Sequence, residues 1–158
     1  MFIFKRKPKK VPRNDVLIDV ETGIIQIDDT TLYPGYTLTE FEKSPLCSNV
    51  SYEMINPPYK SYYIGKHIIG KYEFWIVLYF YEDALWRIDI GIDNGITEWS
   101  EWTEELELKR KSEHDRILKS YGLPHWSTFA WGEIQSLYDP RTPESSILIT
   151  YNNKPRPY

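Results

Sequence analysis

Cysteine is almost absent from this chain, which has only Cys47 among its 158 residues. One cysteine cannot form an intramolecular disulfide, so the usual mark of a small secreted domain is missing and we expect a reducing compartment, the cytoplasm. The neighbours of Cys47, among them Ser44, Ser48 and Asn49, include no adjacent base. We therefore expect a buried or incidental thiol and not a nucleophile.

Long apolar runs are missing too. The strongest run, Phe74 to Tyr81, has eight residues, whereas a helix needs about 20 to cross a bilayer. Met1-Phe2-Ile3-Phe4 is followed at once by basic residues, whereas a signal peptide places its charge before a longer apolar stretch. We therefore expect neither a membrane span nor an export signal.

Motifs for catalysis and cofactor binding are also lacking. The sequence has no phosphate-binding glycine loop, no paired-cysteine metal set, no G-x-S-x-G turn and no H-E-x-x-H. Because the only histidines are His67, His114 and His125, a histidine-based metal or proton-transfer site has few ways to form. We expect a protein that is not an enzyme and has no catalytic residue, cofactor or metal, although missing motifs do not exclude an enzyme.

Aromatic residues, in contrast, are abundant. Six Trp, thirteen Tyr and six Phe make up 16% of the chain, more than a core of this size needs. Two interpretations stay open. The rings fill strands, which favour them, or some Tyr and Trp lie at the surface as anchors of a protein interface.

Charge is unevenly distributed. The net charge is -4, but residues 1–13 hold six of the nineteen Lys and Arg and no acid. The rest has thirteen basic and twenty-three acidic residues, a balance of -10, which repels nucleic acid and favours a basic protein partner. Since no linker or repeat divides the chain, we expect a basic lead (1–13) that is dispensable for folding, one domain (14–151) and a tail (152–158).

Local patterns predict an antiparallel sheet. Segments that read as strands or extended chain are residues 16–20, 24–27, 47–56, 59–69, 74–81, 85–92, 131–138 and 146–151. The first two should form a hairpin turned at Thr22-Gly23. Segment 74–81 is apolar on both alternating faces and should be covered on both sides. In 85–92, Arg87 and Asp89 should share a wet face opposite Trp86.

Two helices are predicted. Thr37 and Glu40 match a capping box that opens a short helix ending near Ser44. A long helix should run from about Ser100 to Tyr121. Its expected sheet-facing side comprises Trp102, Leu106, Ile117 and Leu118, with Arg110 and His114 interrupting it. The fold class that follows is α+β, an antiparallel sheet packed by one long helix in the C-terminal half and one short helix.

The start of the long helix is the candidate partner-binding surface. It comprises Glu98, Glu101, Trp102, Glu104 and Glu105. Acids near a helix N-terminus complement the helix dipole, and this explains most of the pattern. Because the acids exceed what capping needs, the same residues also form a candidate surface for a protein partner.

A candidate polar cluster consists of His114, Asp115, Asp139 and Arg141. Consecutive helical residues point about 100° apart, so adjacency alone does not pair His114 with Asp115. His114 is either hydrogen-bonded where the helix meets the sheet or titrates in a functional role. Asp139 and Arg141 either close a structural turn or act as a dyad.

The last third of the chain resembles a known family. The residues that carry the resemblance are Trp99-Ser100-Glu101-Trp102, Lys111-Ser112-Glu113-His114-Asp115, Tyr121-Gly122-Leu123-Pro124, Phe129-Ala130-Trp131-Gly132-Glu133-Ile134, Ser136-Leu137-Tyr138-Asp139-Pro140-Arg141 and Ser145-Ser146-Ile147. They are similar to a family of small uncharacterised bacterial proteins that occur beside polymorphic or contact-dependent toxin genes and are regarded as immunity proteins. The resemblance carries over no catalytic residue.

The resemblance implies a protein that neutralises a bacterial toxin by stoichiometric binding. The partner would be a toxin, and a basic nuclease fits the acidic charge because its own substrate is anionic. The alternatives are a small enzyme with an unrecognised site and a structural or regulatory interaction domain. Genomic context and a pocket holding His114 with a carboxylate would discriminate among them.

Overall fold

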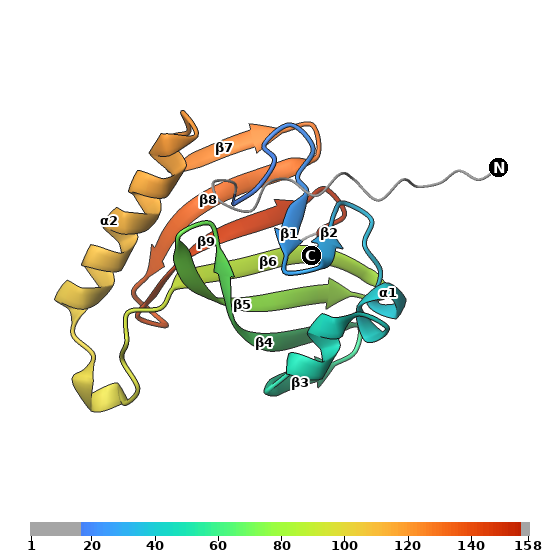
Figure 1. Cartoon of the computed structure of the whole chain (residues 1–158), viewed down its shortest axis with the longest axis horizontal. Coiled ribbons are helices and arrows are strands. Elements are labelled where there is room, and N and C mark those ends of the chain that lie inside the picture. The colour runs from blue at the N-terminus through green and yellow to red at the C-terminus, as the bar shows by residue number, and fades with distance from the viewer. Residues whose placement is uncertain (1–16, 156–158) are drawn as a thin grey trace.

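The computed structural model describes residues 17–155 and confirms the predicted α+β class (Figure 1). A seven-stranded antiparallel sheet has the order β3-β4-β5-β6-β9-β8-β7. Its strands are β3 (Tyr52–Asn56), β4 (Tyr59–Ile69), β5 (Tyr72–Tyr81), β6 (Ala84–Ile92), β7 (Trp126–Phe129), β8 (Gly132–Asp139) and β9 (Glu144–Tyr151). The remaining elements are the small hairpin β1 (Ile25–Ile27) and β2 (Thr30–Leu32), the helices α1 (Leu38–Glu42) and α2 (Glu104–Ser120), and the 3-10 helices η1 (Pro45–Asn49) and η2 (Trp99–Glu101).

One face of the sheet, called the inner face here, is covered. Its β5 side chains include Ile76 and Leu78, which are fully buried. They belong to one hydrophobic cluster with Leu118 of α2, Phe41 of α1 and Ile25 of β1. Figure 1 shows the hairpin in front of the sheet, α2 along its left side and α1 at its lower right. The core therefore lies between the inner face and these elements.

The opposite face, called the outer face here, is not covered by any element among residues 17–155. On β5 it carries Trp75, Val77, Tyr79 and Tyr81, which are all only partly buried. The prediction that segment 74–81 is covered on both sides is therefore wrong. Side chains on both faces of this strand are apolar, but α2, α1 and the small hairpin pack on the inner face alone.

Strand β6 also differs from its predicted pattern. Ile88 and Ile90 are buried on the inner face as expected. A register shift between β5 and β6 beside Tyr79 displaces Trp86, so its ring contacts Tyr79 on the outer face. Asp89 does point to the predicted face, but that face is not wet at this position because Asp89 is only 6% exposed.

The capping box of the short helix is confirmed. The Thr37 hydroxyl accepts the Glu40 N–H at 3.1 Å, and the Glu40 carboxylate accepts the Thr37 N–H at 2.9 Å. Helix α1 ends two residues before the predicted Ser44, and Pro45 then opens η1. The extended segment predicted from residue 47 therefore begins only after Asn49, with β3 at Tyr52.

The predicted N-terminal hairpin is confirmed at its turn, where Asp19 and Ile24 pair antiparallel across residues 20–23, but residues 17–20 form no strand. Val16 lies outside the described residues, and Leu17 and Ile18 are both buried, so the expected alternation of inward and outward side chains does not form. Asp19 makes a single bridge to Ile24. Instead β1 pairs with β2, because a turn at Asp28, with φ of 51°, reverses the chain after Ile27.

Helix α2 starts later than predicted, and the side that it turns toward the sheet agrees with the prediction in its second half but not in its first. Thr103 caps it by accepting the Leu106 N–H at 3.1 Å, after the separate turn η2. Leu106 is 37% exposed, so its predicted place in the core is wrong. The buried side of α2 comprises Glu107, Arg110, His114, Ile117 and Leu118. Ile117 and Leu118 are therefore on the predicted side, with Arg110 and His114 between the apolar positions, whereas Glu107 takes the place expected for Leu106.

The C-terminal strands agree closely with the sequence. Strands β8 and β9 begin and end within two residues of the predicted segments. Strand β7, at the sheet edge, was not predicted. The C-terminal tail predicted from residue 152 is tied down at its start, because Asn152 donates to Ala130 and Asn153 to Leu85. Within residues 17–155, no helix is long and apolar enough to cross a membrane.

Candidate functional site

The predicted partner-binding residues lie together at the start of α2, here called the acidic helix start (Glu98, Glu101, Trp102, Glu104 and Glu105). Two of these residues shape the turn η2 itself. Glu101 accepts the N–H groups of Thr97 and Glu98 at 3.2 Å each, and these hydrogen bonds lower its pKa. Glu98 closes the same turn reciprocally. Glu104 and Glu105 are exposed, and Glu104 accepts a hydrogen bond from the Tyr138 hydroxyl at 3.4 Å.

Two tryptophans stack beside these carboxylates. The rings of Trp99 and Trp102 are nearly parallel, at 8°, with 5.2 Å between their centroids. Trp99 is 69% exposed, and a hollow of about 210 Å³ adjoins the pair. An exposed indole near carboxylates suits contact with a cationic side chain. Trp102 was among the predicted site residues and Trp99 was not, although their spacing of three residues was a usable signal.

The buried side of α2 holds a polar connection to β9. Glu107 accepts the Ser145 N–H at 3.0 Å and the Ser145 hydroxyl at 2.7 Å. It also forms an ion pair of 3.1 Å with Arg110, and both side chains are buried. Paired in this way, the two charges fix the helix on the sheet and are not free for a partner.

His114 is fully buried between α2 and β6. Its Nε2 accepts the backbone N–H of Ile92 at 3.1 Å, so Nδ1 carries the ring proton. Burial, reinforced by the positive charge of Arg110, lowers the pKa of His114 to about 3. The imidazole is therefore neutral near pH 7. This geometry is the hydrogen-bonded alternative left open by the sequence.

The other members of the candidate polar cluster have separate partners. Asp115 pairs with Lys111 at 2.7 Å, one turn along the same helix. Asp139 pairs with Arg141 at 3.0 Å in the turn between β8 and β9, and these contacts lower the pKa of Asp139. The four residues thus belong to three sets of contacts. Residues 17–155 contain no group of three or more His, Cys, Asp or Glu that could hold a metal ion.

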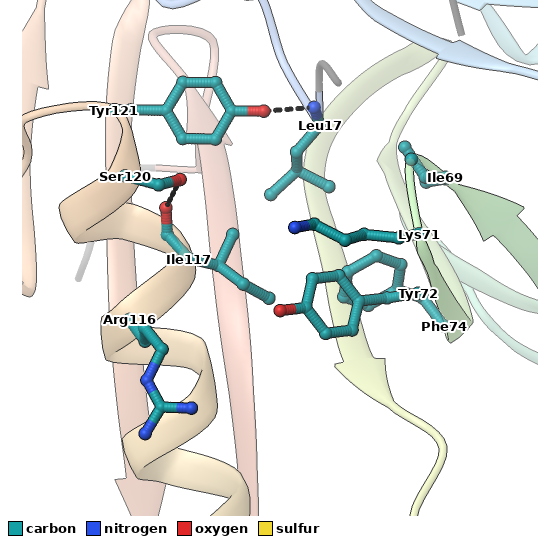
Figure 2. Close-up of a pocket in the computed structure, with 10 residues that line it drawn as sticks. Leu17, Ile69, Lys71, Tyr72, Phe74, Arg116, Ile117, Ser120 and Tyr121 are labelled. Atoms are coloured by element: carbon teal, nitrogen blue, oxygen red, sulfur yellow. Dashed lines mark hydrogen bonds between the residues drawn. The ribbon is translucent and has the colours of Figure 1, made fainter. Parts of the chain in front are cut away.

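A pocket of about 270 Å³ lies between α2 and the turn that joins β4 to β5 (Figure 2). Its walls are mostly apolar and include Leu17 and Ile117. Figure 2 shows the amino group of Lys71 and the hydroxyl of Tyr72 directed toward the helix. The Leu17 N–H donates to the Tyr121 hydroxyl and ties the chain to the end of α2. The pocket suits a small apolar group, and we assign it no ligand.

The sheet order and the single covered face define an α+β domain that is similar to a solved structure. A chain of the structure described as "Rhs1-CT in complex with cognate immunity protein RhsI1" matches with a TM-score of 0.52 and 14% identity, over 85% of this chain and 86% of that chain. At this identity the likeness shows a shared fold. No protein-family model matches the chain, and no curated protein matches it.

Proposed function

We propose that this chain is a cytoplasmic immunity protein that neutralises a bacterial toxin by forming a stoichiometric complex with it. The observation that carries the proposal is the fold shared with a chain of a solved complex between Rhs1-CT and its cognate immunity protein. The description of that complex names both partners. We favour the immunity role because residues 99–147 independently resemble a family of immunity proteins.

Charge and surface chemistry support a binding role. The chain beyond residue 13 has a balance of -10, and the acidic helix start presents Glu104 and Glu105 to solvent. Such a surface attracts a basic partner over a Debye length of about 8 to 10 Å. The exposed ring of Trp99 offers a contact for the cationic side chains of that partner. A basic nuclease toxin is the partner class that this charge favours.

The test is co-expression of this chain with the C-terminal domain of a polymorphic toxin whose gene neighbours the gene for this chain. We expect cells to survive the toxin domain only when the chain is present, and protection to saturate near one copy per toxin molecule. Titration of the purified toxin domain with the purified chain measures the same ratio. Protection at a small fraction of the toxin concentration would indicate catalytic turnover and refute the proposal.

A further inference from the structure

Two rows of paired residues run across the outer face through all seven strands. The first row is Tyr52, Tyr63, Val77, Asp89, Leu148, Gln135 and Trp126. The second row is Met54, Ser61, Tyr79, Arg87, Thr150, Glu133 and Thr128. Directly paired residues of antiparallel strands share a face. The outer face is therefore one continuous surface, and its β3 to β6 half is rich in rings.

The centre of this surface is held in one conformation. Arg87 makes two hydrogen bonds to Asp89, at 2.6 and 2.7 Å, and its guanidinium lies 4.8 Å from the centroid of the Tyr79 ring. The indole of Trp75 lies over Gly91, where a Cβ would come within 2.2 Å of the ring. Glycine at this position lets the ring lie close to the sheet. Side chains that are already ordered lose little entropy when a partner binds.

The residue types on the outer face match those of binding hot spots, where Tyr, Trp and Arg supply most of the binding free energy. The charges on this surface leave an excess of acid. Arg87 is paired with Asp89, and Lys66 at the rim is paired with Asp93 at 3.0 Å. Glu73 and Glu133 form no ion pair within the described part of the chain. A second copy would bring the same acidic excess and be repelled, whereas a basic surface would be attracted.

We propose that the outer face is the docking surface of this protein and that its occupant is the toxin, through a surface with an apolar centre and basic side chains around it. This inference rests on the proposed function. The two surfaces then have different roles in binding. The acidic helix start speeds the encounter through long-range attraction, and the outer face holds the complex through contact.

The test is a substitution that blocks the outer face without removing any packing. Ser61 is partly buried between Met54 and Tyr79 in the second row, so Ser61→Arg adds both bulk and positive charge there. The matched control is Ser48→Arg, on the exposed side of η1, which packs on the inner face. We expect Ser61→Arg to weaken binding of the neighbouring gene's toxin domain at least about 30-fold, and Ser48→Arg to leave it unchanged. Thermal unfolding checks that both variants are folded.

A second measurement needs no substitution. Met54 and Ile55 are consecutive residues of β3 that point to opposite faces, and they are 55% and 47% exposed. Hydroxyl-radical labelling of the wild-type complex should protect Met54 and leave Ile55 labelled as in the free chain. Equal labelling of Met54 in the free and bound chains would overturn the inference.

The outcomes separate this inference from the proposed function. If the wild-type chain protects cells and Ser61→Arg protects equally well, the proposed function stands and the outer face is not the docking surface. If the wild-type chain neither protects nor binds, both fail. If sedimentation shows that the wild-type chain is a dimer and Ser61→Arg is a monomer, the occupant is a second copy and the inference is overturned.

Discussion

The imidazole of His114 accepts the backbone N–H of Ile92 at 3.1 Å, and this bond requires the neutral ring. A histidine in an unfolded chain titrates near 6.5, whereas the pKa of His114 in the folded protein is about 3. Between these values the unfolded chain binds a proton that the folded protein does not. Stability must therefore fall as the pH decreases from about 6.5 toward 3.

We predict that His114 contributes up to about 1.4 kcal/mol per pH unit to this loss. The charged groups that act on the ring are Arg110 and Lys111, which oppose its protonation, and Asp115, which favours it. Denaturant unfolding at several pH values should show a shallower slope below pH 6 for His114→Gln than for the wild type. The exposed His125→Gln is the control and should keep the wild-type slope. Identical slopes for His114→Gln and the wild type would contradict the prediction.

The buried ion pair between Glu107 and Arg110 should be costly to break. Glu107→Ala leaves the Arg110 guanidinium buried without its carboxylate, and we expect a loss of about 3 to 5 kcal/mol in the free energy of unfolding. Glu105→Ala removes an exposed carboxylate from the same helix and should change stability by less than about 0.5 kcal/mol. Similar losses of unfolding free energy in Glu107→Ala and Glu105→Ala would show that the Glu107–Arg110 ion pair does not stabilise the fold.

Two leucines of α2 provide a test of which side of the helix packs on the sheet. Leu118 is 1% exposed, so Leu118→Ala should cost about 2 to 5 kcal/mol through lost burial and a cavity. Leu106→Ala should cost less than about 1 kcal/mol, because Leu106 is partly solvated already. Chemical denaturation of both variants measures the difference, and a larger cost at Leu106 would contradict the described packing.

Gly23 and Gly95 separate backbone strain from crowding. Their φ angles are 76° and 77°, so alanine is strained equally at both, by about 1 to 2 kcal/mol. A Cβ at Gly23 would lie 2.6 Å from the Trp131 ring, whereas a Cβ at Gly95 would meet nothing within 4 Å. Gly23→Ala should therefore cost about 1 to 3 kcal/mol more than Gly95→Ala in thermal or denaturant unfolding. Equal costs would mean that the Trp131 ring moves aside freely.

The acidic helix start should act on the rate of association. Replacing Glu104 and Glu105 by Lys leaves the Glu101 cap intact and reverses the exposed charge. We expect stopped-flow mixing with the toxin domain to show slower association, a weaker dependence of that rate on salt and nearly unchanged dissociation. A large increase in the dissociation rate would place these residues in the contact itself.

Local chemistry explains which elements were predictable. Thr37 with Glu40 specifies a capping box wherever it stands, because all four hydrogen-bonding groups lie within one turn. Strands β8 and β9 are bounded by turn residues whose preferences are equally local. The strand predicted over residues 16–20 does not form in its described part, because Leu17 and Ile18 are both buried in the core instead of alternating between two faces.

The candidate surfaces were predictable only in part. The carboxylates at the start of α2 are visible in the sequence, because their spacing and the helix start are both local features. On the sheet-facing side of the same helix His114 was placed correctly, but Glu107 was missed, because its burial depends on a partner in a distant strand, Ser145. Hydrophobic periodicity does not identify a buried position that is occupied by a paired carboxylate.

The sequence by itself determined the acidic charge, the abundance of rings, the caps and most of the strands of this protein, since these depend on composition and near neighbours. Only the tertiary structure decided that one face of the sheet is covered and the other is not. Along β5, Ile76 and Val77 are equally apolar, yet the first is buried and the second only partly so. The difference arises from where α2, α1 and the small hairpin pack, and packing between distant segments is not encoded in the alternation of one strand.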